Sequence, residues 1–510
     1  FGTNSIELIP SLDPEERDSV HMKKSMWDMT VSLSSLLDDY GLDVWFWLAL
    51  KGDVADPAIA DAELESRRKL FAACKRIDDI FVPGGDPGDT HPDILMPWLK
   101  RMADVLHENH PDAGLWVSNQ GFTPEENAAF FGYIKEHNPD WLAGVVFGPW
   151  VKLSIEEMRA NTPEGYPIRR YPDITHTVRC QYSVPGWDRA FARTLGREPF
   201  NPRPKAMRQI QNLFAPYAEG SVTYSDGIND DVNKAVWSAL EWDTNVNVDS
   251  VLNDYGRYFI GEETGSTVVD GLNAFEENWI GPLATHSGIE ENFKRWKSIE
   301  EKASVEDMKN NWRLQLCLLR AYYDTYVQRR LLWEMELEEK AYTVLQKAES
   351  IGVSQAIAEA KTALAEADVQ PESLQQLRQR LDAFGVLLFS SIGMQLDVKN
   401  YQARSAERGA ILEFLDTPLN NRKWLEAELD SILTLTPENN QLKRIDTIVN
   451  WENPGVGSFY DDLGNASKQP HLVSQKNWAD DPGRVASPQE EFSKYENARL
   501  SWVDQAQTLF

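Results

Sequence analysis

Residues 76–89 read RIDDIFVPGGDPGD, and this stretch decides the fold. Its apolar run, Ile80, Phe81 and Val82, has β-type residues and ends abruptly in a segment of proline, glycine and aspartate. An α/β barrel presents its catalytic acids in this way, on loops at the carboxyl ends of buried strands. The stretch therefore predicts a parallel sheet with a site at the ends of its strands.

The same order of segments recurs over residues 1–260. The expected strands are residues 5–9, 43–50, 79–82, 114–118, 142–147, 168–171 with 177–182 close behind, and 220–224. The expected helices are residues 14–40, 60–76, 94–109, 124–137, 154–160, 204–214 and 232–241. Apolar strands alternating with helices predict a parallel sheet buried on both faces. About seven repeats, without a G-x-G-x-x-G after the first strand, favour a (β/α)8 TIM-type barrel over a dinucleotide-binding sheet.

Three regions differ in composition. We expect a (β/α)8-type catalytic barrel over residues 1–260, a helical bundle over 261–440 and an irregular region over 441–510, which could belong to a truncated β domain. The chain opens with FGTNSIELIP, which already reads as a strand and lacks an initiator methionine. We therefore expect the first strand of a standard barrel to be missing from a processed or fragmentary chain.

The net charge of −29 argues against nucleic acid and anionic membranes as partners. The three cysteines are far apart and the eight histidines are scattered, so the sequence predicts no disulfide framework, metal site or other cofactor. No uninterrupted apolar run is long enough to span a membrane. The compartment and the oligomeric state stay open, with a secreted or periplasmic location favoured and a homo-oligomer among the possibilities.

Glycosidic cleavage generally needs two carboxyl groups facing one cavity. The candidates are Asp86 and Asp89 after the third expected strand, and Asp226 after the last one. Asp226 is closely followed by Asp230 and Asp231, and in such a run mutual repulsion is expected to raise the pKa of at least one carboxylate, as an acid catalyst requires. The alternative for the neighbouring Asp230 and Asp231 is capping of the helix that follows.

Aromatic and amide side chains at strand ends fit a saccharide, because aromatic rings stack on the apolar faces of sugars. Strand alternation places Trp45 and Trp47 on one face and Phe46 on the other. The alternative for these tryptophans is packing in the barrel wall. The candidate substrate-binding residues near strand ends are Trp45, Trp47, Lys51, Trp116, Asn119, Trp150 and Tyr224.

A third cluster, Arg169, Arg170, Asp173 and His176, follows the sixth expected strand. Its arginines could bind a substrate carboxylate or sulfate, or hold the catalytic aspartates in place. Asp173 and His176 could form an acid–base or orienting pair. The alternative is an internal salt-bridge network at the rim of the barrel.

The segment Gly84-Gly85-Asp86 resembles the G-G-D-E of β-N-acetylhexosaminidase barrels. A barrel followed by a helical bundle also resembles O-GlcNAc hydrolases and α-glucuronidases. The hexosaminidase resemblance implies that Asp86 orients the substrate acetamido group, but Pro87 stands where that family has its acid. The acid would then come from Asp89 or from another strand. The arginine cluster instead resembles the α-glucuronidase group, which acts on acidic sugars.

These patterns together predict a glycoside hydrolase that removes a terminal sugar, a hexosaminide or a uronide, during carbohydrate or polysaccharide degradation. Asp86, Asp89 and Asp226 are the expected catalytic carboxyls, and carbohydrate is the expected partner. The alternative is a non-catalytic carbohydrate-binding or scaffold protein on the same fold. Two carboxyls facing one pocket would separate the first reading from the second.

Overall fold

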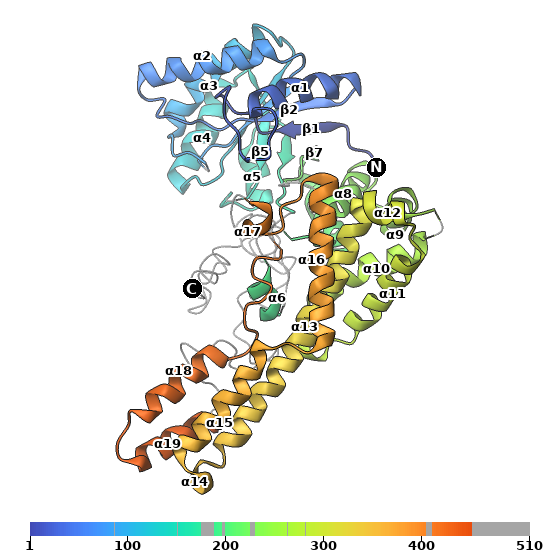
Figure 1. Cartoon of the computed structure of the whole chain (residues 1–510). Helices are drawn as coiled ribbons and strands as arrows, with labels where there is room; N and C mark the ends of the chain where they lie inside the picture. The colour runs from blue at the N-terminus through green and yellow to red at the C-terminus, as the bar shows by residue number, and fades with distance from the viewer. Residues whose placement is uncertain are drawn as a thin grey trace. The chain divides into compact units, whose positions relative to one another are not determined.

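The computed structural model describes residues 1–450 except Asp86, Trp150, 175–187, 196–198, 225–229, Glu263, Gly281 and 404–410. These residues form two compact units, one of residues 1–174 with 203–252 and the other of 188–202 with 253–450. The first unit alternates strands and helices, whereas the second is helical (Figure 1). Among the described helices, none combines the length and the apolar character needed to cross a membrane.

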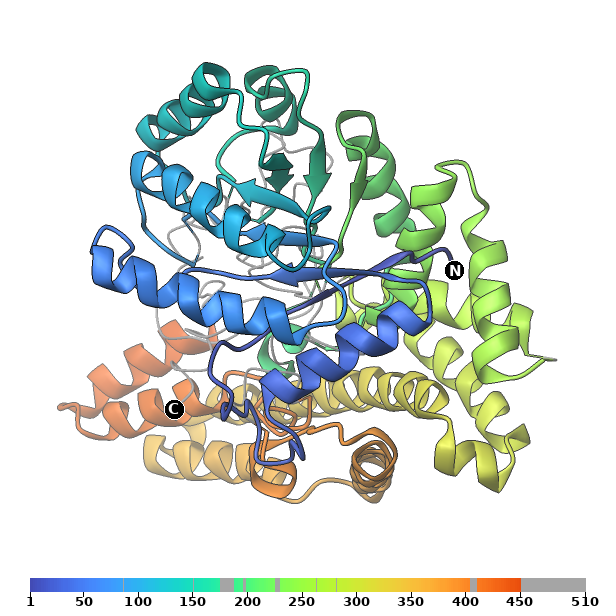
Figure 2. The ribbon, with the colours of Figure 1, turned by 90° about the horizontal axis from the view of Figure 1, so that it is seen from above.

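The first unit contains a parallel sheet whose strands follow one another in chain order. Its strands are β1 (Ser5–Leu8), β2 (Asp43–Trp47), β3 (Asp79–Val82), β4 (Gly114–Ser118), β5 (Leu142–Phe147), β6 (Ile168–Arg170) and β7 (Gly220–Ser221). Its helices are α1 (Met26–Asp39), α2 (Pro57–Ala73), α3 (Pro92–His107), α4 (Pro124–His137), α5 (Ile155–Asn161), α7 (Pro204–Phe214) and α8 (Asp231–Trp242). The helices α1 to α4 lie on the outer side of the curved sheet (Figure 2).

The predicted mixed α/β fold with a parallel sheet is confirmed. Within the described residues the sheet has seven strands in the order β1 to β7, and it curves as part of a barrel whose edges are β1 and β7. Burial alternates most clearly along β2, whereas β5 and β6 are buried at nearly every position. In β2, Val44 and Phe46 are fully buried, while Trp45 and Trp47 are partly buried on the opposite face.

Several predicted element bounds need correction. The helix predicted over 14–40 begins only at Met26, because the Ser25 side chain caps it by accepting a hydrogen bond from the backbone N–H of Asp28. The strand predicted over 43–50 ends at Trp47. The strand predicted over 220–224 has two residues, followed by an isolated bridge between Tyr224 and Asp173. The predicted segment 177–182 lies outside the described residues.

The turn after β3 packs closely against the end of β4. The backbone N–H of Gly85 donates to the Gln120 carbonyl at 2.8 Å. A Cβ atom added at Gly84 would lie 2.3 Å from the Ser118 carbonyl oxygen and 2.7 Å from the Phe122 ring. The glycines of the opening stretch therefore allow two strand ends to approach each other, and they do not leave space for a ligand.

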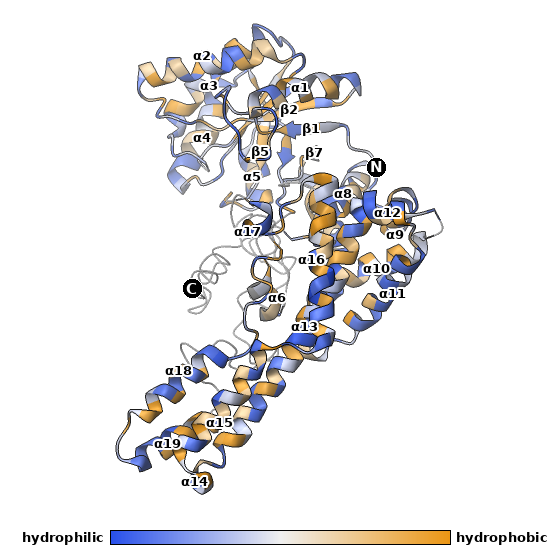
Figure 3. Ribbon diagram, viewed as in Figure 1, coloured by the Kyte–Doolittle hydropathy of each residue, from blue (hydrophilic) through white to orange (hydrophobic). Residues whose placement is uncertain are grey.

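The second unit is built from helices of very different lengths. They are α6 (Arg189–Thr194), α9 (Val248–Tyr255, which begins in the first unit), α10 (Gly265–Asn278), α11 (Gly288–Lys302), α12 (Val305–Asn310), α13 (Trp312–Leu345), α14 (Ala348–Ile351), α15 (Val353–Ala365), α16 (Glu372–Ile392), α17 (Val398–Tyr401), α18 (Arg422–Leu433) and α19 (Glu438–Val449). A π-helical turn, Gly256–Ile260, continues α9. Residues with hydrophobic and hydrophilic side chains alternate along these helices, as helices with one buried face require (Figure 3).

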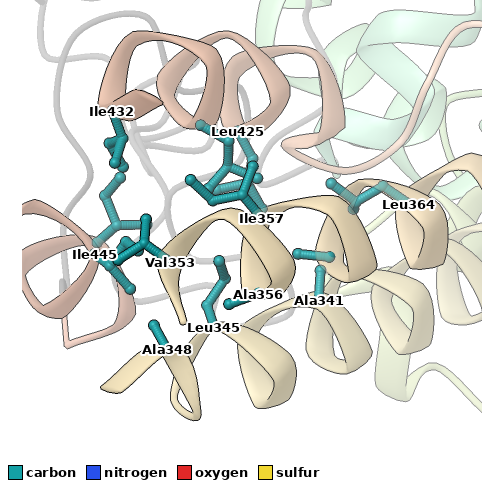
Figure 4. Packing of buried hydrophobic residues seen from close by; sticks show 13 residues of the cluster. Ala341, Leu345, Ala348, Val353, Ala356, Ile357, Leu364, Leu425, Ile432 and Ile445 are labelled. Atoms are coloured by element: carbon teal, nitrogen blue, oxygen red, sulfur yellow. The ribbon is translucent and has the colours of Figure 1, made fainter. Parts of the chain in front are cut away.

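Helix α13 belongs to two buried regions. Every residue from Leu314 to Gln328 is buried, and the Arg320 guanidinium donates to Asp324 at 2.7 Å inside this part. Toward its end, Ala341 and Leu345 join a second cluster with α14, α15, α18 and α19 (Figure 4). A single helix thus contributes to two cores of the second unit.

We predict that Gly84→Ala destabilises the protein by about 1–3 kcal/mol, because the new methyl group overlaps the β4 backbone. Gly132→Ala is the matched control, since Gly132 is exposed on α4 with no atom within 4 Å of an added Cβ. This control should stabilise the protein by roughly 0.5–1 kcal/mol. Chemical denaturation followed by tryptophan fluorescence measures both. Equal effects of the two substitutions would contradict the packing argument.

Candidate functional site

The carboxyl ends of the strands are connected by aromatic rings that cross the inside of the sheet. The Phe81 ring, on β3, lies 5.2 Å from that of Tyr171, directly after β6. Tyr171 in turn lies 5.7 Å from Tyr224, after β7. Phe81, Val146 and Tyr171 form a buried cluster, against which Trp47 packs. The loops that follow β3, β6 and β7 therefore start from one shared aromatic layer.

Two amide side chains are buried where β4 ends. Asn119 donates to the Asn127 side chain at 2.6 Å and so joins the strand end to α4. Gln120 accepts from the Ser118 hydroxyl at 2.9 Å, and its side-chain oxygen lies 3.3 Å from the position of a Cβ at Gly148, after β5. Asn119 thus holds the loop in place, and Gln120 lies between the ends of neighbouring strands.

The structure describes some of the predicted carboxyl groups, whereas others lie outside the described residues. Asp89 is exposed in the turn after β3, and Asp173 is buried, 4% exposed, beside the bridge to Tyr224. Asp230 takes the N-cap position of α8, as the capping alternative predicts, although its side chain makes no capping hydrogen bond. Four predicted site residues lie outside the described residues, namely Asp86, Trp150, His176 and Asp226.

Lys51 is not part of this arrangement. Its side chain is 56% exposed and its ammonium group lies 3.5 Å from the Glu16 carboxylate. An exposed pair of this kind contributes little to stability.

A second group of polar side chains faces the inside of the sheet, which we call the lumen. Glu7, Trp45 and Asp79 are partners in register on β1, β2 and β3 and share this face. Arg169, on β6, donates to Glu7 at 2.8 Å, and its guanidinium lies 4.4 Å from the Trp45 ring. The ring of Trp116, on β4, packs 5.5 Å from that of Trp45.

The two predicted arginines point to opposite faces of the sheet. Arg169 faces the lumen, whereas Arg170 donates to the side chains of Gln211 on α7 and Glu241 on α8. Arg170 is also 5.1 Å from the Trp237 ring, under the helix layer. Both arginines therefore form internal ion pairs, as in the salt-bridge alternative, Arg169 with Glu7 and Arg170 with Glu241, but on opposite faces of the sheet.

Burial gives Asp79 unusual acid–base behaviour. The indole N–H of Trp116 donates to its carboxylate at 2.8 Å, and Gly114 leaves the necessary space because a Cβ there would lie 2.2 Å from the Asp79 oxygen. Burial raises the pKa of Asp79 to about 6, against the opposing effects of Trp116 and Arg169. Burial also raises the pKa of Glu7, although Arg169 acts in the opposite direction.

These lumen residues line a cavity of about 650 Å³. The cavity lies between the edge strands β1 and β7 and is bounded on the outside by α8. First residues of several strands contribute to it, including Ser5, Asp43, Asp79, Ile168 and Gly220. The cavity thus reaches the amino ends of the strands, and it also extends to Tyr171 and Tyr224 of the aromatic layer.

The structure brings together Trp45, Trp116, Arg169 and Tyr224 of the predicted residues, all of which line the cavity. The sequence reading missed Glu7 and Asp79, although both are acids at inward positions of apolar strands, a pattern that could have indicated them. The described residues contain no group of three or more His, Cys, Asp or Glu side chains arranged to hold a metal ion.

Comparisons with known proteins give no assignment: no protein-family model matches this chain, and no curated protein shows significant similarity to it.

The raised pKa of Asp79 predicts a pH-dependent stability. Between pH 4 and 6 the folded protein binds the Asp79 proton more tightly than the unfolded chain does. The protonated Asp79 therefore contributes to the free energy of unfolding at low pH, and this contribution is lost as the pH rises through 6. The substitution Asp79→Asn removes this pH dependence, because asparagine does not titrate. Relative to the parent, the variant should gain roughly 1–3 kcal/mol in stability between pH 4 and 7.

The melting temperatures of both proteins, measured from pH 4 to 7.5, check this expectation. Asp104→Asn on α3 is the control, because that carboxylate is 63% exposed and pairs only with Lys100 among the contacts described. Its melting curve should follow the parent at every pH. If the melting temperature of Asp79→Asn also ran parallel to that of the parent across this pH range, the pKa of Asp79 would not be raised by folding.

Proposed function

We propose that this chain is a glycoside hydrolase that removes a terminal sugar, a hexosaminide or a uronide, by carboxylate acid–base chemistry. We also propose that its parallel sheet belongs to a (β/α)8-type barrel followed by a helical bundle. The fold supports this assignment through its order, since each of the strands β1 to β6 is followed by a helix before the next parallel strand. In such folds ligands bind outside the carboxyl ends of the strands.

The observation that carries the proposal is the aromatic layer of Phe81, Tyr171 and Tyr224. The Tyr171 ring lies 5.2 Å from that of Phe81 and 5.7 Å from that of Tyr224. It therefore links the start of the loop after β3 to the start of the loop after β7. In the sequence, Asp86 belongs to the first of these loops and Asp226 to the second. We propose that these two acids act together on one bond.

The chemistry requires two carboxyls about 5–5.5 Å apart for retention or about 6.5–9.5 Å apart for inversion. In the proposed site one of Asp86 and Asp226 protonates the leaving oxygen and the other serves as base or nucleophile. Asp173 is buried next to Tyr224 and is suited to orient the second loop. Asp89, exposed in the first loop, is the alternative acid.

We expect Asp86→Asn and Asp226→Asn each to lower kcat roughly 10²- to 10⁴-fold, because each removes a group that transfers a proton or attacks the sugar. The assay is a panel of aryl hexosaminides, uronides and neutral glycosides. Asp104→Asn serves again as the surface control and should keep the parental rate. Circular dichroism melts confirm that the variants are folded. Parental turnover in both variants would remove this site assignment.

The alternative, a non-catalytic carbohydrate-binding protein, is favoured by one observation. The middle of the lumen is filled by Phe81, Val146 and Tyr171, with Trp47, Trp116 and Tyr224 packed against them. This leaves aromatic surface near the strand ends without requiring a catalytic pair. Saturable binding of sugars by calorimetry, with no turnover of any aryl glycoside, would support the alternative over the hydrolase.

A further inference from the structure

The edge strands β1 and β7 both run parallel to the rest of the sheet, and both line the same cavity. Every other described strand has a hydrogen-bonded neighbour on each side, whereas β1 pairs with β2 and β7 pairs with β6. Unpaired strand edges readily accept a further strand. We call the space between these two edges the seam.

The backbone of each edge strand presents polar groups to the seam. On β1, Asn4 accepts from Asp43 of β2, so alternation turns the backbone groups of Ser5 and Glu7 away from β2. After β7, the N–H groups of Val222 and Tyr224 donate toward the β6 side, to Arg170 and Pro172, which turns Thr223 to the seam. In the described part of the chain, no backbone hydrogen bond is found for Ser5, Glu7 or Thr223 on that side.

The lumen side of the seam holds an unsatisfied cation. Arg169 is 4% exposed and lines the cavity, and only one of its terminal nitrogens, Nη1, donates to Glu7. Its Nε and Nη2 atoms are buried without a hydrogen-bond partner among the described residues. A buried donor left unpaired is destabilising, so an acceptor in the cavity would stabilise the site. Because Glu7 and Asp79 already supply negative charge to the lumen, a neutral acceptor fits better than another acid.

The outer side of the seam carries two tryptophans among polar groups, since Lys234, Ser238 and Glu241 of α8 also line the cavity. Trp237 and Trp242 of α8 line the cavity, and the Trp242 side chain is 71% exposed. Helix α8 is held near β1 by two contacts, from the Trp242 indole N–H to the Gly2 carbonyl and between the hydroxyls of Thr3 and Ser238 at 2.9 Å. The outward side chains of an occupant would therefore meet the two tryptophans beside polar and charged groups of α8.

We propose that the seam binds an extended polypeptide segment as an additional strand, parallel to β1 and β7. Its inward side chains are small, neutral hydrogen-bond acceptors directed at Arg169, and its outward face carries an apolar side chain that packs against the tryptophans of α8. Main-chain hydrogen bonds to both edges give affinity, and the alternation of side chains gives specificity. The inference does not depend on the proposed hydrolase activity.

The test uses the full 510-residue chain and end-blocked hexapeptides that alternate valine with serine, threonine or asparagine. The expected results are saturable binding by fluorescence anisotropy and a roughly tenfold slowing of amide exchange at Ser5, Glu7 and Thr223. Two matched peptides test the two parts of the argument. Proline at a central position removes the main-chain donor and should abolish binding. Replacement of the inward asparagine by aspartate should weaken binding at pH 7. Binding of this peptide should recover as the pH falls and the aspartate becomes protonated.

Failure of every alternating peptide to bind would overturn the proposal. Equal binding of the proline peptide would overturn it as well, because strand pairing would then not be the cause. Binding without protection of Ser5, Glu7 and Thr223 would place the peptide elsewhere on the protein. Protection of the same amides by xylo- or chito-oligosaccharides, and not by peptides, would make the seam a sugar site instead. Loss of glycosidase activity has no bearing on any of these outcomes.

Discussion

The buried ion pair between Glu7 and Arg169 connects the first and sixth strands across the lumen, and the interior of the sheet is arranged around it. Neighbouring strands contact each other through their ladders, but this pair spans strands that are far apart in the sheet order. Both side chains are almost completely buried, with 5% and 6% of their surfaces exposed. Removing either partner would leave the other charge buried alone, which is far more costly than losing the pair together.

The same interaction organises the aromatic residues. The Arg169 guanidinium lies over the rings of Trp45 and Phe81, at 4.4 and 4.9 Å, so one cation positions side chains of two neighbouring strands. The Trp116 indole fits beside them because Gly144 leaves room, since a Cβ there would lie 2.3 Å from the ring. The lumen is therefore a packed layer of charged and aromatic side chains.

Much of the first unit could be predicted from the sequence, because short apolar runs alternating with helical segments are typical of a parallel sheet buried on both faces. Within β2, Trp45 and Phe46 each lie on the face that alternation gives them. The site was harder to predict, since Glu7 and Arg169 are 162 positions apart and only the curvature of the sheet brings them together. Adjacent residues need not share a site. Arg169 and Arg170 form one cluster in the sequence, but because they are consecutive in a strand their side chains lie on opposite faces of the sheet. The role of Gly84 also depends on contacts that the sequence does not show, because its neighbour is the end of another strand.

Helix α13 has a consequence for how this chain can vary. Its 34 residues extend about 50 Å and carry side chains of two separate cores on one continuous backbone. Inserting one residue between them would turn the second set of side chains by about 100° relative to the first. The number of residues between Tyr326 and Leu337 is therefore fixed by geometry, and changes of length in this region can be accommodated only in connections such as the one between α15 and α16.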